Sequence, residues 1–341
     1  MNNIHITLNN KFLTYMLSAV LFVFPVHLVF IFLKNLLYDS EIFKAKKVDA
    51  KVVSIGNIAL GGTGKTPTTV AIANFLERKG YSVGIVTRGH GRKNIKNSFL
   101  LKDHSWKECG DEVVLLKNNT SSSTHIFVSL DKVYAAEQLS SMGCNIILLD
   151  DGFQHRRIHR DIDIVLLGPE NQNKKWQFVY PYGLLREPFS YLKRADITIA
   201  TKSNLVKATN LTSDHNLSLE VKEEVLSSGS VKNINDLGRQ SGILSVCSIG
   251  DPDSFSKTLN SININVDKRL VFPDHWPFNL NDIEKINGLA SKENLKHIVC
   301  TEKDFVKLFE FKNALDIDIC AVVMKHQLSE EIEQDILSRL A

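Results

Sequence analysis

A glycine-rich turn at residues 61–66, with the sequence Gly-Gly-Thr-Gly-Lys-Thr, constrains the fold of this chain more than any other feature. An apolar segment at 52–55 precedes the turn, and a helical pattern follows at 66–79. Glycines let the backbone wrap around phosphate oxygens, and the helix N-terminus adds the positive end of its dipole. In such a P-loop, Lys65 reaches the β- and γ-phosphates and the Thr66 hydroxyl ligates Mg²⁺. The turn therefore predicts a site for ATP and Mg²⁺.

The strict P-loop pattern has a further glycine five residues before Gly64, where this chain has Ala59. An ordinary glycine-rich connection between strand and helix is the alternative. The Lys-Thr pair directly after Gly64 favours the P-loop. The residues that we expect to contact the nucleotide are Gly61, Gly62, Thr63, Gly64, Lys65 and Thr66.

Strand and helix patterns alternate after the turn. Short apolar strands are expected at 83–87, 125–128, 146–149, 162–167 and 197–200, with a helix at 132–142. Nearly continuous apolar strands that alternate with helices are typical of a mostly parallel sheet covered on both faces. The predicted fold class is therefore α/β, with a P-loop NTPase-type parallel sheet.

A second αβ block follows a polar stretch rich in Ser, Asn and Thr. Its strands are expected at 243–247, 269–272, 297–300 and 317–323, and its helices at 254–259 and 282–289. The sequence thus predicts four parts: an N-terminal apolar helix with a basic flank at 1–50, a P-loop domain at 51–206, a linker at 207–235 and a smaller α/β domain at 236–341.

Two adjacent carboxylates, Asp150 and Asp151, follow the apolar strand at 146–149. A carboxylate at the end of such a strand commonly holds Mg²⁺ or its water shell beside a P-loop. Two like charges side by side repel each other, which is hard to explain by structure alone. For Asp151, a role as a turn cap is an equally good explanation. We expect Thr66, Asp150 and Asp151 to form the metal site.

Three weaker signals remain open on spacing alone. Asp111 begins a helical pattern and could be a general base, although complementing the helix dipole is the better default. His275 lies at a strand end and could act in acid–base chemistry or simply face solvent. Arg186 and Glu187 share a loop, where the arginine could bind a phosphate or the two could form an internal ion pair.

An apolar segment at residues 12–33 has no Asp, Glu, Lys or Arg and is long enough to enter a bilayer. Pro25 and His27 weaken a spanning helix. No small-residue cleavage site precedes Lys34, which argues against a cleaved signal peptide. Lysines concentrate after the segment, so the positive-inside rule predicts a cytoplasmic main body. A buried core helix is the alternative.

Charge and cysteine content exclude several classes. The net charge of +3 is too small to indicate nucleic-acid binding by the protein as a whole. A basic cluster at 155–160 could face anionic lipid or substrate, or be an ordinary solvated surface. The five cysteines lie far apart in the chain, so neither a zinc knuckle nor a CxxC pair is expected.

Eight short motifs occur in one order along the chain. They are Gly56-Asn57, the run from Gly61 to Pro67, Arg88-Gly89, Gly110-Asp111-Glu112, the run from Asp150 to His155, Arg186-Glu187, Asp274-His275 and the run from Thr301 to Asp304. In this combination the chain resembles the tetraacyldisaccharide 4'-kinases, the lipid A pathway kinases of Gram-negative bacteria. The resemblance covers nearly the whole chain, including the N-terminal apolar segment.

The resemblance implies transfer of the ATP γ-phosphate to the 4'-hydroxyl of a tetraacylated glucosamine disaccharide 1-phosphate, in a cleft between the P-loop domain and the smaller domain. It implies that Asp111 is the catalytic base, paired with His275. It places Lys65 and Thr66 at the nucleotide and Mg²⁺, Asp150 and Asp151 at the metal and phosphate site, and Arg186 and Glu187 around the transferred phosphate. Two positions depart from the family pattern, because His90 stands where tyrosine is common and Lys132 where arginine is common.

These observations together predict an enzyme at the bacterial inner membrane with its catalytic body on the cytoplasmic face. It would act on a glycolipid, without nucleic acid and without a required protein partner. Two other functions remain: a membrane-associated P-loop ATPase that drives a protein partner, and a cytosolic P-loop ligase acting on a small acid, with 12–33 as a core helix.

Overall fold

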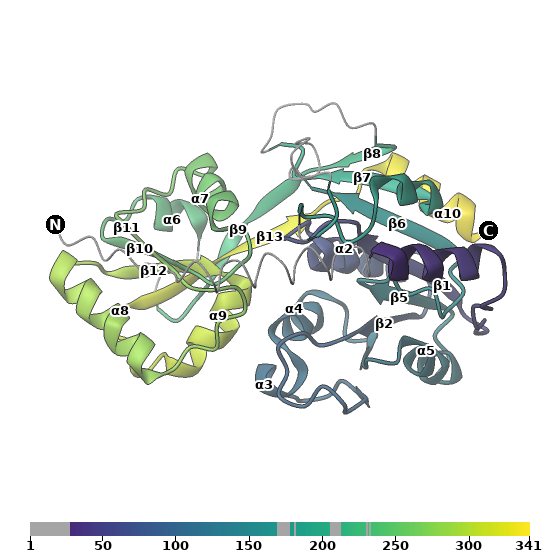
Figure 1. Ribbon diagram of the computed structural model, residues 1–341. Coiled ribbons are helices and arrows are strands. Elements are labelled where there is room, and N and C mark those ends of the chain that lie inside the picture. Colours follow the sequence, from purple (N-terminus) through teal and green to yellow (C-terminus); the bar gives the residue numbers. More distant parts are fainter. Residues whose placement is uncertain (1–27, 169–177, 181, 205–212, 230, 232) are drawn as a thin grey trace, which may run out of the picture.

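Two β-sheets with helices packed on them make up the computed structural model (Figure 1). The structure describes residues 28–168, 178–180, 182–204, 213–229, 231 and 233–341. The larger sheet has eight strands in the order β3-β4-β2-β5-β1-β6-β7-β8, and the smaller has five in the order β11-β10-β12-β13-β9. The first eight strands in the chain thus form one sheet and the last five the other.

All strand pairs of the larger sheet are parallel except β3 with β4. The central strands are buried and nearly continuously apolar, as the sequence predicts for a parallel sheet. The strands are β1 (Lys51–Asn57), β2 (Val83–Thr87), β3 (Phe99–Leu100), β4 (His125–Val128), β5 (Ile146–Asp150), β6 (Ile162–Leu167), β7 (Ile197–Thr201) and β8 (His215–Leu217).

Helices cover both faces of the larger sheet, and alternate strand residues enter two different cores. Val53 of β1 contributes to the core under α2 and α4, whereas its neighbour Val52 contributes to the core under α5. The helices are α2 (Lys65–Arg78), α3 (Trp106–Cys109), α4 (Asp111–Asn119), α5 (Lys132–Ser141) and the 3-10 helix η3 (Phe189–Arg194). This arrangement confirms the predicted mixed α/β class with a large, mostly parallel sheet.

The smaller sheet is parallel except for β9, which pairs antiparallel with β13. Its strands are β9 (Leu219–Ser227), β10 (Ile243–Cys247), β11 (Lys268–Val271), β12 (His297–Thr301) and β13 (Asp318–His326). Its helices are α6 (Ile234–Gly238), α7 (Pro252–Ser261), α8 (Leu280–Glu293), α9 (Glu302–Leu308) and the 3-10 helix η4 (Phe309–Phe311). Below, the second domain means residues 219–326.

The region expected to be a linker, 207–235, contains regular structure. It includes β8, all of β9 and the first residues of α6. The strand β9 lies at the edge of the smaller sheet, and its Glu223 and Glu224 are exposed. An edge strand needs little apolar character, because one side faces water. Its polar composition therefore resembles that of a connecting segment.

The last helix, α10 (Glu330–Leu340), belongs to the larger sheet rather than to the smaller domain expected at 236–341. Its side chains Ile332, Ile336 and Leu340 are buried in the core that α2 and α4 also cover. In Figure 1 this helix lies beside β6 and β7. The second domain is therefore inserted between β8 and α10. The paired strands β9 and β13 of the smaller sheet run side by side and extend toward the larger sheet.

Residues 28–39 are helical and pack on the larger sheet through Ile31. Residues 12–27 of the expected apolar helix lie outside the described part of the chain. Among the residues that are described, no helix has the length and apolar character needed to cross a membrane.

Candidate active site

The glycine-rich turn joins the end of β1 to the start of α2. Gly64 is the residue before α2 and has a left-handed backbone, with φ of 81°. A Cβ atom at this position would lie 2.6 Å from Cε1 of His326, at the end of β13. Glycine is therefore required here both for its backbone conformation and for the close approach of a side chain from the second domain.

Three cations surround Asp151, directly after β5. The Arg186 Nη1 atom donates to both carboxylate oxygens, at 2.8 and 2.9 Å. The Lys65 Nζ atom lies 3.7 Å from Asp151 Oδ1. Lys132, which is buried, donates to the backbone carbonyls of Asp150 and Asp151. Burial alone would raise the pKa of Asp151, but Lys65 and Arg186 lower it to about 2. The predicted P-loop lysine and loop arginine thus converge on one carboxylate.

Asp150 differs from its neighbour in having an oxygen without a partner. The Thr87 hydroxyl donates to Oδ2 at 3.0 Å, whereas Oδ1 is buried and accepts no hydrogen bond from the described residues. Burial, with the charge of Asp151 adding to it, raises the pKa of the Asp150 carboxyl. A buried carboxylate with a free oxygen fits a hard divalent cation. Thr66, the second residue of α2, is half-buried directly after the glycine-rich turn.

These residues could hold a metal ion only together with a nucleotide. In the described part of the chain, no group of three or more His, Cys, Asp or Glu side chains is arranged to bind a metal. Kinase sites bind Mg²⁺ through one or two carboxylates plus substrate phosphates, so such a group is not needed. The donor set of Asp150 and Thr66 is consistent with that kind of site.

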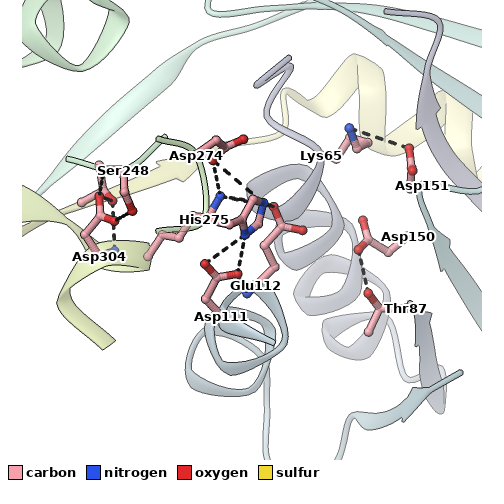
Figure 2. A network of polar contacts seen from close by, with 12 residues as sticks. Lys65, Thr87, Asp111, Glu112, Asp150, Asp151, Ser248, Asp274, His275 and Asp304 are labelled. Atoms are coloured by element: carbon pink, nitrogen blue, oxygen red, sulfur yellow. Dashed lines mark hydrogen bonds and ion pairs between the residues drawn. The ribbon is translucent and has the colours of Figure 1, made fainter. Parts of the chain in front are cut away.

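Asp111 and His275 meet across the two domains (Figure 2). The Nδ1 atom of His275 lies 3.0 Å from Oδ1 and 3.1 Å from Oδ2 of Asp111. Asp111 is buried as the first residue of α4, and Gly110 before it approaches the backbone of His90 too closely for a Cβ atom. His275 follows β11 and has a positive φ of 58°, a strained conformation of the kind that clusters at functional sites.

The environment of Asp111 favours its ionised form. Burial alone would raise its pKa, but the hydrogen bond with His275 and the charges of Lys303 and Lys307 outweigh that effect, so its pKa is lowered. For the adjacent Glu112, which is half-buried, partial burial and the charge of Asp150 raise the pKa. The shift at Asp111 is in the opposite direction, so of these two neighbours Asp111 has the environment that favours the charged carboxylate.

Glu187 does not join the other predicted residues. Its carboxylate accepts from Arg194 Nη2 at 2.6 Å and from Asn35 Nδ2 at 3.3 Å. Arg186 and Glu187 therefore contact different partners, and only Arg186 contacts Asp151. The internal ion pair considered between Arg186 and Glu187 was wrong: Arg186 pairs with Asp151, and Glu187 pairs with Arg194.

The two departures from the family pattern lie at this site. The His90 ring lies 4.3 Å from the ring of His275, centre to centre. Burial is the main cause that lowers the pKa of His90. Burial lowers the pKa of Lys132 to about 8, although Asp151 and Asp150 oppose that effect. Both side chains thus contact the candidate catalytic groups directly.

The sequence did not assign a role to three further residues. Lys303 and Lys307 of α9 lie beside His275 and Asp111, and Thr87 at the end of β2 binds Asp150. The two lysines are four residues apart and therefore share one helix face. Lys303 lies within the run from Thr301 to Asp304, one of the eight motifs, but no role was assigned to it, because that spacing alone is common on solvated helices. Lys307 lies outside every motif.

The chain is similar to known proteins over almost its whole length. A family model described as tetraacyldisaccharide-1-P 4'-kinase matches residues 17–341. The tetraacyldisaccharide 4'-kinase of Syntrophus aciditrophicus is 32% identical over 341 residues, which cover 90% of this chain and 89% of that protein. The one from Bdellovibrio bacteriovorus is 33% identical over 297 residues, covering 82% and 86%.

A solved structure agrees with these relatives. The crystal structure of LpxK from Aquifex aeolicus, described as an "apo" form in complex with ATP, superimposes with a TM-score of 0.74 and 27% identity. The alignment covers 95% of this chain and 99% of that one. With the glycine-rich turn, the paired carboxylates and the contact between domains, these matches lead to one assignment. The chain belongs to the tetraacyldisaccharide 4'-kinase family.

Proposed function

We propose that this protein transfers the γ-phosphate of ATP to the 4'-hydroxyl of a tetraacyldisaccharide 1-phosphate, a lipid A precursor. The observation that carries the proposal is the contact between Asp111 and His275, which holds an ionised carboxylate where the second domain meets the nucleotide-binding domain. A hydroxyl nucleophile needs such a base within reach of its proton. The relatives, named for this activity, support the same substrate.

The reaction forms one P–O bond and breaks another. As the 4'-oxygen attacks the γ-phosphorus, Asp111 accepts the hydroxyl proton and His275 holds the carboxylate in place. The bond between the γ-phosphorus and the β,γ-bridging oxygen breaks, and ADP leaves. Phosphoryl transfer relies on charge stabilisation more than on covalent chemistry. Lys65 and Arg186, which converge on Asp151, are the cations placed to provide it.

Asp150 and Thr66 would hold Mg²⁺, because the free oxygen of Asp150 is available to a cation. When bound with ATP, Mg²⁺ neutralises charge on the β- and γ-phosphates. Asp151, expected as a second ligand, is engaged by Arg186 through both oxygens. Its role in the proposal is therefore to position Lys65 and Arg186.

We also propose that the protein works at the cytoplasmic face of the inner membrane. The helix at 28–39 buries Ile31 and exposes Phe30 and Phe32, at 64% and 57% of their surface. Lys34 of the same helix donates to the backbone carbonyl of Gln154, and Arg156 donates to that of Asn35, so these two cations hold the helix against the catalytic domain. A tetraacylated substrate resides in a bilayer, so an apolar face beside the catalytic domain fits the proposed activity.

The decisive experiment is incubation of the purified protein with ATP, Mg²⁺ and tetraacyldisaccharide 1-phosphate, followed by mass analysis of the lipid. A product heavier by one phosphoryl group, with ADP formed in equal amount, supports the proposal. Release of free phosphate without a new lipid, stimulated by a protein partner, would instead favour the P-loop ATPase. The comparisons give no support to that alternative.

A further inference from the structure

Helix α9 of the second domain presents two lysines to the Asp111–His275 pair. Lys303 and Lys307 lie one turn apart, and α9 begins where the Thr301 side chain accepts a hydrogen bond from the Asp304 backbone. The Lys303 side chain is only 13% exposed, and that of Lys307 is fully buried. Buried lysines are rare unless they are paired, so both positions call for an explanation.

Lys303 contacts the nitrogen of His275 that faces away from Asp111. Its Nζ atom lies 3.0 Å from His275 Nε2 and 3.0 Å from Asp274 Oδ1. An ammonium group donates hydrogen bonds and cannot accept them. The Nε2 atom must therefore be the acceptor, and the imidazole proton is on Nδ1. From there it is donated to Asp111, at 3.0 Å.

Lys307 approaches the other side of the carboxylate. Its Nζ atom lies 3.6 Å from Asp111 Oδ2. It donates to Ser248 Oγ at 2.6 Å and forms an ion pair with Asp304 Oδ1 at 3.1 Å. The Asp304 carboxylate is itself held by the Ser248 backbone N–H and the Thr301 hydroxyl. A fixed positive charge is thus built into the second domain at the point where it meets Asp111.

We propose that Lys303 and Lys307 are positioning residues that set the proton distribution of the Asp111–His275 pair. Lys303 selects the neutral His275 tautomer with its proton on Nδ1, and Lys307 keeps Asp111 ionised. Before the reaction, the Asp111 carboxylate therefore carries no proton and can accept one. His275 donates a hydrogen bond to that carboxylate and orients it. This inference rests on the proposed function for its kinetic consequence, although the tautomer can be measured without any substrate.

Other charged groups also face the Asp111–His275 pair. Glu112 Oε1 of α4 lies 3.8 Å from His275 Nε2 and 3.9 Å from Lys303 Nζ, and Asp274 Oδ1 lies 3.9 Å from His275 Nε2. These acids would favour a second proton on His275. The His90 ring also contacts the His275 ring, with 4.3 Å between the ring centres and the two planes tilted by 48°. Lys303 is closer to Nε2 than either acid, so its hydrogen bond decides the tautomer.

The first test measures the tautomer directly. In the full chain labelled with ¹⁵N-histidine, the His275 ring signals are assigned by their loss in His275→Gln. We expect an unprotonated Nε2 and a protonated Nδ1 at neutral pH. In Lys303→Met, Nε2 should gain proton character, whereas Lys303→Arg should retain the wild-type pattern. A protonated Nε2 in the wild-type chain would overturn the inference, and would leave the proposed kinase activity untouched.

The second test measures kinetics with ATP and tetraacyldisaccharide 1-phosphate. Lys303→Met should lower kcat about 10- to 100-fold and change KM for ATP less than about twofold, since it disturbs the orientation of a general base. Lys292→Met, an exposed lysine of α8, controls for the lost charge and should leave kcat unchanged. Unchanged kcat in a folded Lys303→Met variant would overturn the role of Lys303.

Lys307 is tested through the pH profile. Removal of a cation near a carboxylate raises the carboxylate pKa. Because the base must be ionised, the acidic limb of kcat in Lys307→Met should move to higher pH by about one unit. Ser248→Ala keeps the charge of Lys307 and removes the two hydrogen bonds of the Ser248 hydroxyl, one accepted from Lys307 and one donated to Asp304. Its profile should therefore move less, and it serves if Lys307→Met fails to fold. An acidic limb unmoved in both variants would contradict the role of Lys307.

Discussion

The Nδ1 atom of His275 lies 3.0 Å from a carboxylate oxygen of Asp111, although the two residues are 164 positions apart in the chain. One belongs to the start of α4 beside the larger sheet, and the other to a loop after β11 in the smaller sheet. The candidate base is therefore complete only while the two domains are in contact. A kinase of this design couples its chemistry to the position of one domain on the other.

Removal of the candidate base should abolish most of the turnover. Asp111→Asn should lower kcat by about 10²–10⁴-fold with little change in ATP affinity, because a positioned general base contributes that much. His275→Ala should cost less. In the double variant the two losses should combine to less than their product, because the residues act as one unit. Steady-state kinetics of the three variants, with Asp103→Asn as an exposed control, measures this; fully multiplicative losses would contradict the pairing.

Loss of the P-loop lysine should stop phosphoryl transfer while the fold survives. Lys65 lies at the phosphate side of the turn, and its Nζ atom is near Asp151. We expect Lys65→Ala to lower kcat by orders of magnitude, because the lysine stabilises charge on the transferred phosphoryl group. Thermal unfolding should stay close to that of the control Lys96→Ala, an exposed position. Wild-type activity in a folded Lys65→Ala protein would disprove the P-loop assignment.

Two glycines of the turn should respond differently to alanine. Gly64 has a φ of 81° and no room for a Cβ atom beside His326, whereas nothing lies within 4 Å of a Cβ atom at Gly62. Gly64→Ala should destabilise the fold by about 1–2 kcal/mol for the left-handed backbone alone and should weaken ATP binding. Gly62→Ala should change stability little. Calorimetry with and without ATP measures the unfolding stability and the ATP binding of both variants. Equal losses in the two variants would show that the close approach of His326 is unimportant.

Stability should fall in acid as Asp151 is protonated. The folded-state pKa of this carboxyl is about 2, below its ordinary value near 3.8. A lowered pKa contributes stability that is present above the unfolded-state value and is lost as pH falls toward 2. We expect a loss on the order of 2 kcal/mol from this group between about pH 5 and pH 2. Urea unfolding at several pH values should show a smaller acid loss in Asp151→Asn than in the wild type.

Exposed phenylalanines of the N-terminal helix should govern lipid binding. The double change Phe30→Ser and Phe32→Ser should reduce co-sedimentation with phosphatidylethanolamine–phosphatidylglycerol vesicles, because both side chains are exposed. The melting temperature should change little. Ile31→Ser, at the buried position between them, should instead destabilise the fold. Equal vesicle binding by the double variant and the wild type would refute a lipid-binding role for these two side chains.

The sequence predicts the strands of the larger sheet closely. The apolar runs at 83–87, 125–128 and 162–167 coincide with β2, β4 and β6 residue for residue. Such strands are buried on both faces, so their side chains must be apolar and the signal is local. The strand β9 was expected to be a linker, because an edge strand can be as polar as a loop.

The candidate site was predictable only where motifs mark it. The glycine-rich run locates Lys65, because only glycines let the backbone come close to phosphate oxygens. The acidic run locates Asp150, because metal binding requires carboxylates. Glu187 shares a motif with Arg186, yet side chains of neighbouring residues can point to different partners, and here Glu187 binds Arg194. Lys303 lies in a motif that gave it no role, and Lys307 lies in none, because the environment of both is created by the packing of α9 on α4.

The position of α10 in the first core affects how the protein is made. Ile332, Ile336 and Leu340 complete that core, but they follow the entire second domain in the chain. During synthesis on the ribosome, β1 to β8 emerge before these side chains exist. The nucleotide-binding domain must therefore wait with part of its apolar surface uncovered until the inserted domain has been translated. The strands of the second domain are contiguous in the chain, so this domain can fold in that interval. The domain whose synthesis starts later is therefore the one that can complete its fold first.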